Sequence, residues 1–308
     1  MITHTDIEQA AFRIQGRVRR TPILRLAADE LGLGYDLTLK LELLQHAGSF
    51  KPRGAFNRIL SAGAVPEAGV IAASGGNHGA AVAYAARALG LRAEIYIPAL
   101  TPAAKRSRIE SFGAMVVQGG ATYNEALAAC RVRQAETGAL DVHAYDHSAV
   151  LAGQGTVARE IEQDAPELTD LLVATGGGGL IGGIAAWYQG RVRVIGVEPE
   201  GCPCLHDALA AGAPVASPVG GVAADSLGAR QVGAVMFPIA RNFVAEAVLV
   251  PDDAIIAARR LIWDRLRLIA EPGGAVALAA LLCGAYVPKP GARVGVLLCG
   301  SNSGEIPA

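Results

Sequence analysis

Short apolar segments rich in β-branched residues alternate with longer, alanine-rich segments along most of this chain. The short segments have the length of buried strands, and the long ones have the length of helices. We expect strands at 37–43, 69–73, 93–97, 115–118, 171–174, 192–197 and 294–298. We expect helices at 5–14, 53–62, 78–89, 103–112, 123–136, 153–163, 180–187 and 252–268. Strands that alternate with helices predict parallel sheets covered on both faces, so the fold class is α/β.

The alternation falls into two stretches, one from about 69 to 118 and another that begins near 171, with no obvious linker between them. A chain of 308 residues is long enough for two lobes. We expect two open, twisted, mostly parallel sheets with flanking helices. The small domain would be 48–142 and the large domain 1–47 plus 143–308, with the ligand in the cleft between them.

The composition narrows the class of protein. The net charge is −1, and no basic run indicates a nucleic-acid surface. The N-terminus lacks the apolar core of a signal peptide, and charged or glycine residues interrupt the long apolar stretches. We therefore expect a cytoplasmic protein without a membrane span. The five cysteines are odd in number and scattered, which argues against disulfides, and Cys202 and Cys204 lack the C-x-x-C spacing of a metal site.

The segment Gly48-Ser-Phe-Lys-Pro-Arg-Gly-Ala55 follows an expected strand and opens an expected helix. Proline suits the first turn of a helix, so Lys51 lies at a strand-to-helix corner that can face a cleft. Only four of the 27 Lys and Arg residues are lysines. Arginine cannot form a Schiff base, which makes a lysine at such a corner a candidate nucleophile. The alternative is an ordinary solvated lysine at a helix start.

Two further corners follow strands. Ser74-Gly-Gly-Asn-His-Gly79 leads into a helix whose first N–H groups can bind an anion such as a carboxylate, or can simply be capped by Ser74 or Asn77. Cys299-Gly-Ser-Asn302 comes after the last expected strand, where Cys299 is either a polar site residue or a buried cysteine before a turn.

The glycine run Thr175-Gly-Gly-Gly-Gly-Leu180 joins a strand to a helix. Four consecutive glycines allow backbone N–H groups to surround a phosphate at the helix N-terminus. A rival hypothesis uses the same run. Gly177, Gly179 and Gly182 satisfy G-x-G-x-x-G, and Glu198 follows at the distance of a ribose ligand, which is the fingerprint of an NAD(P)-dependent oxidoreductase.

Taken together and in this order, the four motifs resemble those of the serine/threonine dehydratase family of fold-type II pyridoxal-phosphate enzymes. The resemblance covers essentially the whole chain. It implies a fold like that of the tryptophan synthase β subunit, with a large cofactor-binding domain and a small substrate-binding domain. It also implies pyridoxal 5′-phosphate as cofactor and a homodimer.

The resemblance implies a role for each motif. Lys51 would hold the cofactor covalently and later move protons, and Phe50 would lie against the pyridine ring. Asn77 would bind the phenolic oxygen. Cys299 would face the pyridine nitrogen. The residues that would cradle the phosphate are Gly176, Gly177, Gly178, Gly179 and Leu180. The residues that would hold the substrate carboxylate are Ser74, Gly75, Asn77 and His78.

These roles point to β-elimination from a small β-hydroxy amino acid such as L-threonine or L-serine, with release of a 2-oxo acid and ammonia. A neutral Cys299 thiol cannot keep the ring nitrogen firmly protonated, which favours loss of a β-leaving group over transamination. Relatives that racemise serine carry a second serine where this chain has Gly75, so we expect weak racemisation or none. Other possibilities are a lyase for 3-hydroxyaspartate or for a bulkier β-hydroxy amino acid, an amino-acid racemase, and a non-catalytic binding protein.

Two more expectations follow from the resemblance. Some relatives form a divalent-cation site with a Glu and an Asp after the strand that ends in Glu-Pro. Glu198 fits the first position, but Cys204 falls where the aspartate would be, and hard cations prefer oxygen. We therefore expect no metal ligands there. We also expect no C-terminal regulatory domain and no inhibition by isoleucine.

Overall fold

The computed structural model describes residues 1–303, and within them ten strands form two separate sheets. The larger sheet has the strand order β1-β2-β10-β7-β8-β9 and the smaller one β5-β4-β3-β6. The strands of the larger sheet are β1 Ile23–Leu26, β2 Leu37–Lys40, β7 Asp170–Ala174, β8 Arg193–Pro199, β9 Val244–Val250 and β10 Val294–Leu297. Those of the smaller sheet are β3 Val70–Ala73, β4 Ala93–Ile97, β5 Met115–Gln118 and β6 Leu140–Asp141.

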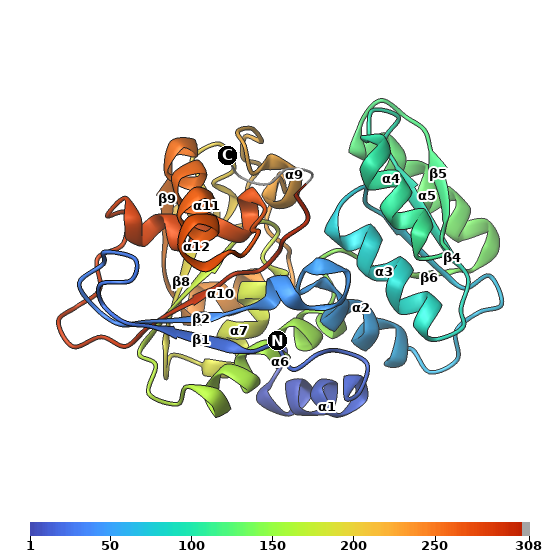
Figure 1. Cartoon of the computed structure of the whole chain (residues 1–308). Helices are drawn as coiled ribbons and strands as arrows, with labels where there is room; N and C mark the ends of the chain where they lie inside the picture. Colours follow the sequence, from blue (N-terminus) through green and yellow to red (C-terminus); the bar gives the residue numbers. More distant parts are fainter. Residues whose placement is uncertain (304–308) are drawn as a thin grey trace.

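The direction of the strands confirms the predicted fold class. In the described part of the chain, only β1 and β2 run antiparallel, and every other neighbouring pair is parallel. Figure 1 shows the smaller sheet with its helices on the right and the larger sheet on the left. Each sheet is buried against its own apolar core, so two open, mostly parallel sheets share one chain.

Helices cover both sheets, as the alternation predicts. Those nearest the smaller sheet are α3 Asn77–Ala88, α4 Ala103–Ser111 and α5 Tyr123–Thr137. The others are α1 His4–Ile14, α2 Lys51–Leu60, α6 Ser148–Asp164, α7 Gly179–Tyr188, α8 Cys204–Ala211, α9 Ala224–Leu227, α10 Phe237–Phe243, α11 Asp252–Leu266 and α12 Pro272–Leu282. Helix α2 packs against both α3 and α6, and it lies between the two lobes in Figure 1. No helix within residues 1–303 has the length and apolar character needed to span a bilayer.

Two expected elements differ from the structure by more than two residues at one end. The strand expected at 37–43 ends at Lys40, because the chain turns into the short 3-10 helices η1 Glu42–Leu44 and η2 His46–Gly48. The helix expected at 153–163 begins earlier, at Ser148, where the His147 side chain accepts the N–H of Ala149. Position 153, inside this helix, requires a glycine, because a Cβ there would lie 2.5 Å from the Arg53 carbonyl oxygen on α2.

The corners that follow strands β3, β7 and β10 carry three of the sequence motifs. Ser74 follows β3, Thr175 follows β7, and Cys299 comes two residues after β10 ends. The carboxyl ends of parallel strands are where α/β proteins bind ligands. The fold therefore places all three corners at ligand-binding edges.

Candidate active site

A small cavity lies where the two lobes meet, and nine residues singled out from the sequence line it. These are Phe50, Lys51, Asn77, Gly176, Gly177, Gly178, Gly179, Leu180 and Cys299. Sequence reasoning gave no role to the other lining residues, which are Tyr145, Ala174, Thr175, Ile181, Ser226, Leu227 and Glu271. Ser74, Gly75 and His78 do not line this cavity.

Lys51 is the first residue of α2, with Pro52 in the first turn behind it. Its ammonium Nζ donates to the Ala144 carbonyl at 2.9 Å and lies 5.2 Å from the centre of the Phe50 ring. Burial lowers the pKa of Lys51 to about 8, although Cys299 and Glu271 pull it upward. An amine with this pKa is partly neutral near physiological pH, so it is available as a nucleophile or base.

The backbone before Lys51 is held by the residues that follow β10. Ser49 pairs with Gly300 in an isolated bridge, and the Phe50 N–H donates to the Cys299 carbonyl at 3.1 Å. Gly48 has φ +69°, and a Cβ there would lie 2.3 Å from Asn302 Oδ1. Glycine is therefore required at this turn, which brings Lys51 and Cys299 into one cavity.

The glycine run forms a cradle that side chains would fill. A Cβ on Gly177 would lie 2.5 Å from the Tyr145 ring, and a Cβ on Gly178 would lie 2.3 Å from Met236. Gly178 also has φ +88° and ends the loop as the N-cap of α7, without a side-chain cap. Because no side chain within residues 1–303 caps it, the first turn of α7 presents N–H groups that can bind a phosphate.

Asn77 lies in the middle of a hydrogen-bonded chain of side chains. Its amide Nδ2 donates to Glu271 Oε1 at 2.6 Å, and its Oδ1 accepts from Asn302 Nδ2 at 2.5 Å. Burial raises the pKa of Glu271 to about 7, although the Asn77 hydrogen bond, Lys105 and Arg108 lower it. The cavity thus holds a carboxyl group that changes its charge near neutral pH.

Cys299 and His78 carry no charge near neutral pH. Burial raises the pKa of the Cys299 thiol far above its ordinary range, and the thiol donates to the Gly273 carbonyl at 3.4 Å. Burial and the nearby Lys51 lower the pKa of His78 to about 3, and its Nε2 lies 2.6 Å from the Val142 carbonyl. A group facing Cys299 therefore meets a neutral thiol.

The corner after β3 presents backbone groups. The Ser74 Oγ accepts the N–H of Gly76, and α3 begins at Asn77 without a side-chain cap. A Cβ on Gly75 would lie 2.9 Å from Thr101 Cγ2. The first turn of α3 can therefore bind an anion through N–H groups, with the His78 side chain turned toward Val142 instead.

The Glu198 side chain binds the backbone at the start of α8, which argues against the dinucleotide hypothesis. Its carboxylate is fully buried and accepts the N–H groups of Leu205 and His206, both at 2.7 Å, at the start of α8. The thiol of Cys204 donates to the Gly176 carbonyl at 3.2 Å. A carboxylate bound in this way to a helix start is not free for a ribose hydroxyl.

The site brings together a lysine of lowered pKa, an uncapped glycine cradle and a neutral thiol at the carboxyl ends of parallel strands. These features define an enzyme that holds a phosphate-bearing cofactor through a lysine. The family model described as "Pyridoxal-phosphate dependent enzyme" matches residues 14–300. The chain belongs to this family, and pyridoxal phosphate is its cofactor.

Three relatives place the chain within the family. It is 40% identical over 305 residues to the L-threonine ammonia-lyase of Geobacter sulfurreducens, in a match that covers 98% of this chain and 76% of the relative. A solved structure of threonine deaminase from T.th. superposes with a TM-score of 0.92 at 35% identity, over 98% of this chain and 99% of that one. The structure of maize serine racemase superposes with a TM-score of 0.92 at 32% identity, over 98% of this chain and 94% of that one. The chain is thus similar to the serine/threonine dehydratase group, as the motifs predict.

Proposed function

We propose that this protein is an ammonia-lyase that converts L-threonine or L-serine to a 2-oxo acid and ammonia by β-elimination of water. The observation that carries the proposal is the meeting of Lys51, the glycine cradle and a neutral Cys299 in one cavity. The similarity to L-threonine ammonia-lyase and to threonine deaminase supports the same reaction.

The chain's residues fit the cofactor group by group. The uncapped N-terminus of α7 and the cradle from Gly176 to Gly179 would bind its phosphate, and Phe50 would cover its ring. Asn77 Nδ2 would donate to its phenolic oxygen, and the thiol of Cys299 would face its ring nitrogen. When bound, pyridoxal phosphate supplies an electron sink for the charge that develops at the substrate α-carbon.

Lys51 would serve as the base of the reaction. Its amine, with a pKa near 8, would take the proton from the α-carbon, so that this proton and the β-hydroxyl are lost together as one molecule of water. Hydrolysis of the enamine product by a second water would then give the 2-oxo acid and ammonia. The N–H groups at the start of α3, together with Ser74, Gly75 and Asn77, would hold the substrate carboxylate. Gly75 offers no side chain for proton transfer at the opposite face, so elimination is favoured over racemisation.

We also propose that the two lobes have separate roles. Residues 48–142 would form the substrate-binding domain, and residues 1–47 plus 143–308 would form the cofactor-binding domain. We further propose that the enzyme acts in the cytoplasm as a homodimer, as the resemblance implies.

Ammonia and 2-oxo acid release from a panel of amino acids tests the function. L-threonine and L-serine should give both products, and 3-hydroxyaspartate and a bulkier β-hydroxy amino acid complete the panel. Lys51→Ala should abolish release and remove the visible absorbance of the bound cofactor. Lys289→Ala, which changes an exposed lysine in the loop before β10, should do neither. Product from neither L-threonine nor L-serine would contradict the proposal.

A further inference from the structure

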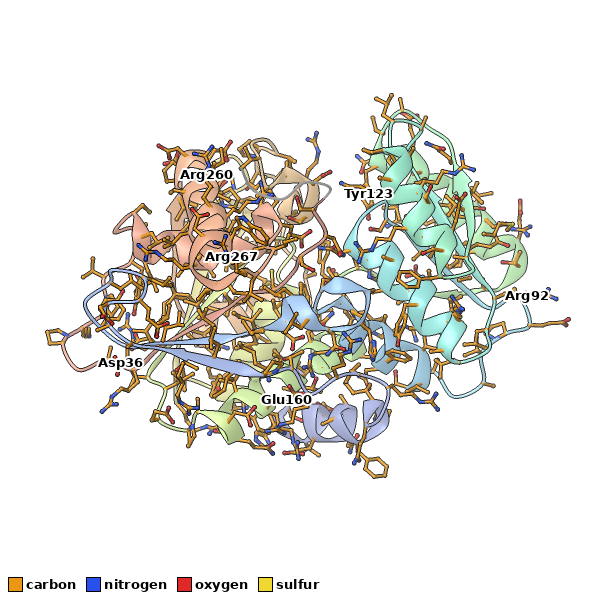
Figure 2. All side chains as sticks on the ribbon, in the orientation of Figure 1. Asp36, Arg92, Tyr123, Glu160, Arg260 and Arg267 are labelled. Carbon is orange, nitrogen blue, oxygen red and sulfur yellow. The ribbon has the colours of Figure 1, made fainter. Side chains whose placement is uncertain are left out.

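Four charged side chains form a buried cluster that does not line the active-site cavity. They are Lys40 (2% exposed), Glu42 (0%), Arg53 (0%) and Glu160 (9%), and we call them the buried charge cluster. Glu160, labelled in Figure 2, comes from α6, which packs against both α1 and α2. Charged groups are rarely buried to this degree, so the cluster requires a reason.

Arg53 makes paired hydrogen bonds to two carboxylates at once. Its Nε and Nη2 donate to the two oxygens of Glu42 at 2.8 and 2.7 Å. Its Nη1 and Nη2 donate to the two oxygens of Glu160 at 2.7 and 2.9 Å. Only the planar, forked guanidinium can satisfy two carboxylates in this way, and a lysine ammonium cannot.

Arg53, Glu42 and Glu160 come from three elements, each of which connects to a segment near Lys51. Arg53 lies in the first turn of α2, two residues after Lys51. Glu42 begins η1, where the next N–H, that of Leu43, donates to Leu298 beside Cys299. Glu160 belongs to α6, and the loop before α6 carries the Ala144 carbonyl that accepts from Lys51 Nζ. Arg53 therefore links the helix that begins at Lys51 to η1 and to α6.

Stability alone does not explain such a cluster. Replacing a buried ion pair with apolar side chains of similar volume is often neutral or stabilising, because burial of charge is costly. Burial lowers the pKa of Arg53, but Glu42 and Glu160 outweigh it, so the arginine stays charged. The cluster also reaches the active site, since the charge of Glu42 is among the groups that raise the pKa of Cys299, after burial and Glu271.

We propose that Arg53 is a positioning residue for Lys51, which it holds in register with Ala144, Cys299 and the glycine cradle through its paired bonds to Glu42 and Glu160. The inference rests on the proposed function only in that Lys51 anchors the cofactor. An error of about 1 Å in the position of a reacting group can cost on the order of a hundredfold in rate, so a rigid tie at this place has a large effect.

The test compares Arg53→Lys with Lys40→Met. Arg53→Lys keeps the positive charge but removes the forked guanidinium that makes the paired hydrogen bonds. Lys40 belongs to the same cluster, but its Nζ donates to the Thr21 carbonyl and to Glu160 and not to α2. Both variants should lower the midpoint of thermal unfolding. Only Arg53→Lys should raise the Kd of the apoenzyme for pyridoxal phosphate, by about tenfold or more, for a loss near 1.4 kcal/mol.

Two further measurements separate positioning from folding. In Arg53→Lys, kcat should fall while KM for the amino acid stays within about twofold, since the carboxylate corner at α3 is unchanged. The pH midpoint of the visible absorbance of the loaded enzyme should also move, because a displaced Lys51 changes both its burial, which dominates its pKa, and its distance from Glu271. Lys40→Met should leave both unchanged.

Glu160→Gln is the milder variant if Arg53→Lys does not fold, and it should shift the Kd and the pH midpoint in the same direction by a smaller factor. A loss of thermal stability without any change in Kd or pH midpoint would overturn the inference, as would equal shifts in Lys40→Met. The Kd for pyridoxal phosphate can be measured without turnover. If the enzyme deaminates no amino acid, the proposed reaction is wrong, but the comparison of the Arg53 and Lys40 variants still tests whether Arg53 positions Lys51.

Discussion

The Asn77 amide donates a 2.6 Å hydrogen bond to the Glu271 carboxylate across 194 positions of the chain. The two side chains come from opposite lobes, one at the start of α3 and the other just before α12. Since Asn77 is the group expected to contact the cofactor's phenolic oxygen, the charge of Glu271 is positioned to influence that contact.

Glu271→Gln should change how both activity and stability depend on pH. Burial raises the pKa of Glu271 to about 7, so the folded protein holds this proton more tightly than the unfolded chain does. The free energy of unfolding should therefore fall, by about 3 kcal/mol at most, as pH rises from about 4.5 to about 7. Glutamine still accepts from Asn77 but does not titrate. In the variant, the free energy of unfolding should not decline over this pH range, and any change of kcat/KM with pH near 7 should disappear.

Denaturant titrations of both proteins between pH 4 and 8 check the stability difference, and pH profiles of kcat/KM check the second part. Parallel stability curves and identical profiles would show that Glu271 does not titrate in this range.

Gly178→Ala should weaken binding of the cofactor phosphate. Gly178 has φ +88°, and a Cβ there would lie 2.3 Å from Met236, so alanine must distort the cradle. We expect the apoenzyme's Kd for pyridoxal phosphate to rise by about tenfold, for strain of about 1–2 kcal/mol. The affinity for pyridoxal, which lacks the phosphate, should change little.

Gly190→Ala is the matched control for this prediction. Gly190 has a similar φ of +85° but no atom within 4 Å of an added Cβ, and it follows α7 rather than preceding it. It should show backbone strain in its thermal stability and an unchanged preference for pyridoxal phosphate over pyridoxal. Equal loss of affinity for both ligands in Gly178→Ala would contradict a specific role in phosphate binding.

The sequence predicts the parts of the site that local patterns encode. Asn77, Cys299 and the glycine run each stand just after a strand end, where the alternation of elements predicts that ligands bind. The strand-to-helix corner expected at Lys51 differs in the structure, because η1 and η2 separate β2 from α2. The predicted start of α2 falls two residues late, because the pattern places the helix after Pro52 and Lys51 already belongs to it.

The sequence does not reveal contacts between distant segments. Glu271 stands in a mostly apolar run, and its place in the cavity lining and its bond to Asn77 in the other lobe identify it as a site residue. Helix α12, Pro272–Leu282, is absent from the prediction because it is buried nearly all round and shows no helical period. Strand β9, Val244–Val250, is absent because it lies at an edge and is mostly half-buried.

Lys51→Met should stabilise the apoenzyme below pH 8. The pKa of Lys51 falls from about 10.5 in the unfolded chain to about 8 in the folded protein, so the charged form opposes folding. The cost is present in full below pH 8 and disappears as pH rises to about 10.5. We expect methionine, which has no charge, to add about 1–2 kcal/mol at pH 7, since Lys51 is only partly buried.

Denaturant unfolding of the two apoenzymes at pH 7 and pH 10.5 measures this difference. At pH 10.5 the advantage of methionine should vanish or reverse, because the bond from Lys51 Nζ to the Ala144 carbonyl is then the remaining contribution. A variant that is less stable than the wild type at both pH values would show that burial does not penalise the charge of Lys51.

Gly75→Ser should not by itself produce a racemase. A Cβ at position 75 would lie 2.9 Å from Thr101 Cγ2 and 3.0 Å from Thr101 Oγ1, so the added side chain must displace a β-branched neighbour. We expect the single variant to lose about 1–3 kcal/mol of stability and to form no D-serine from L-serine. Gly75→Ser combined with Thr101→Ala provides the space. The double variant should recover stability and begin to form D-serine, because a hydroxyl can then reach the face of the α-carbon opposite Lys51.

Chiral chromatography of serine after incubation, together with thermal unfolding of each protein, tests this coupling. Thr101→Ala alone is the control and should deaminate serine without racemising it, since position 75 still lacks a side chain. The stability changes of the two substitutions should be non-additive, as expected for side chains that compete for one space. A single Gly75→Ser variant that racemises serine at full stability would show that Thr101 does not restrict position 75.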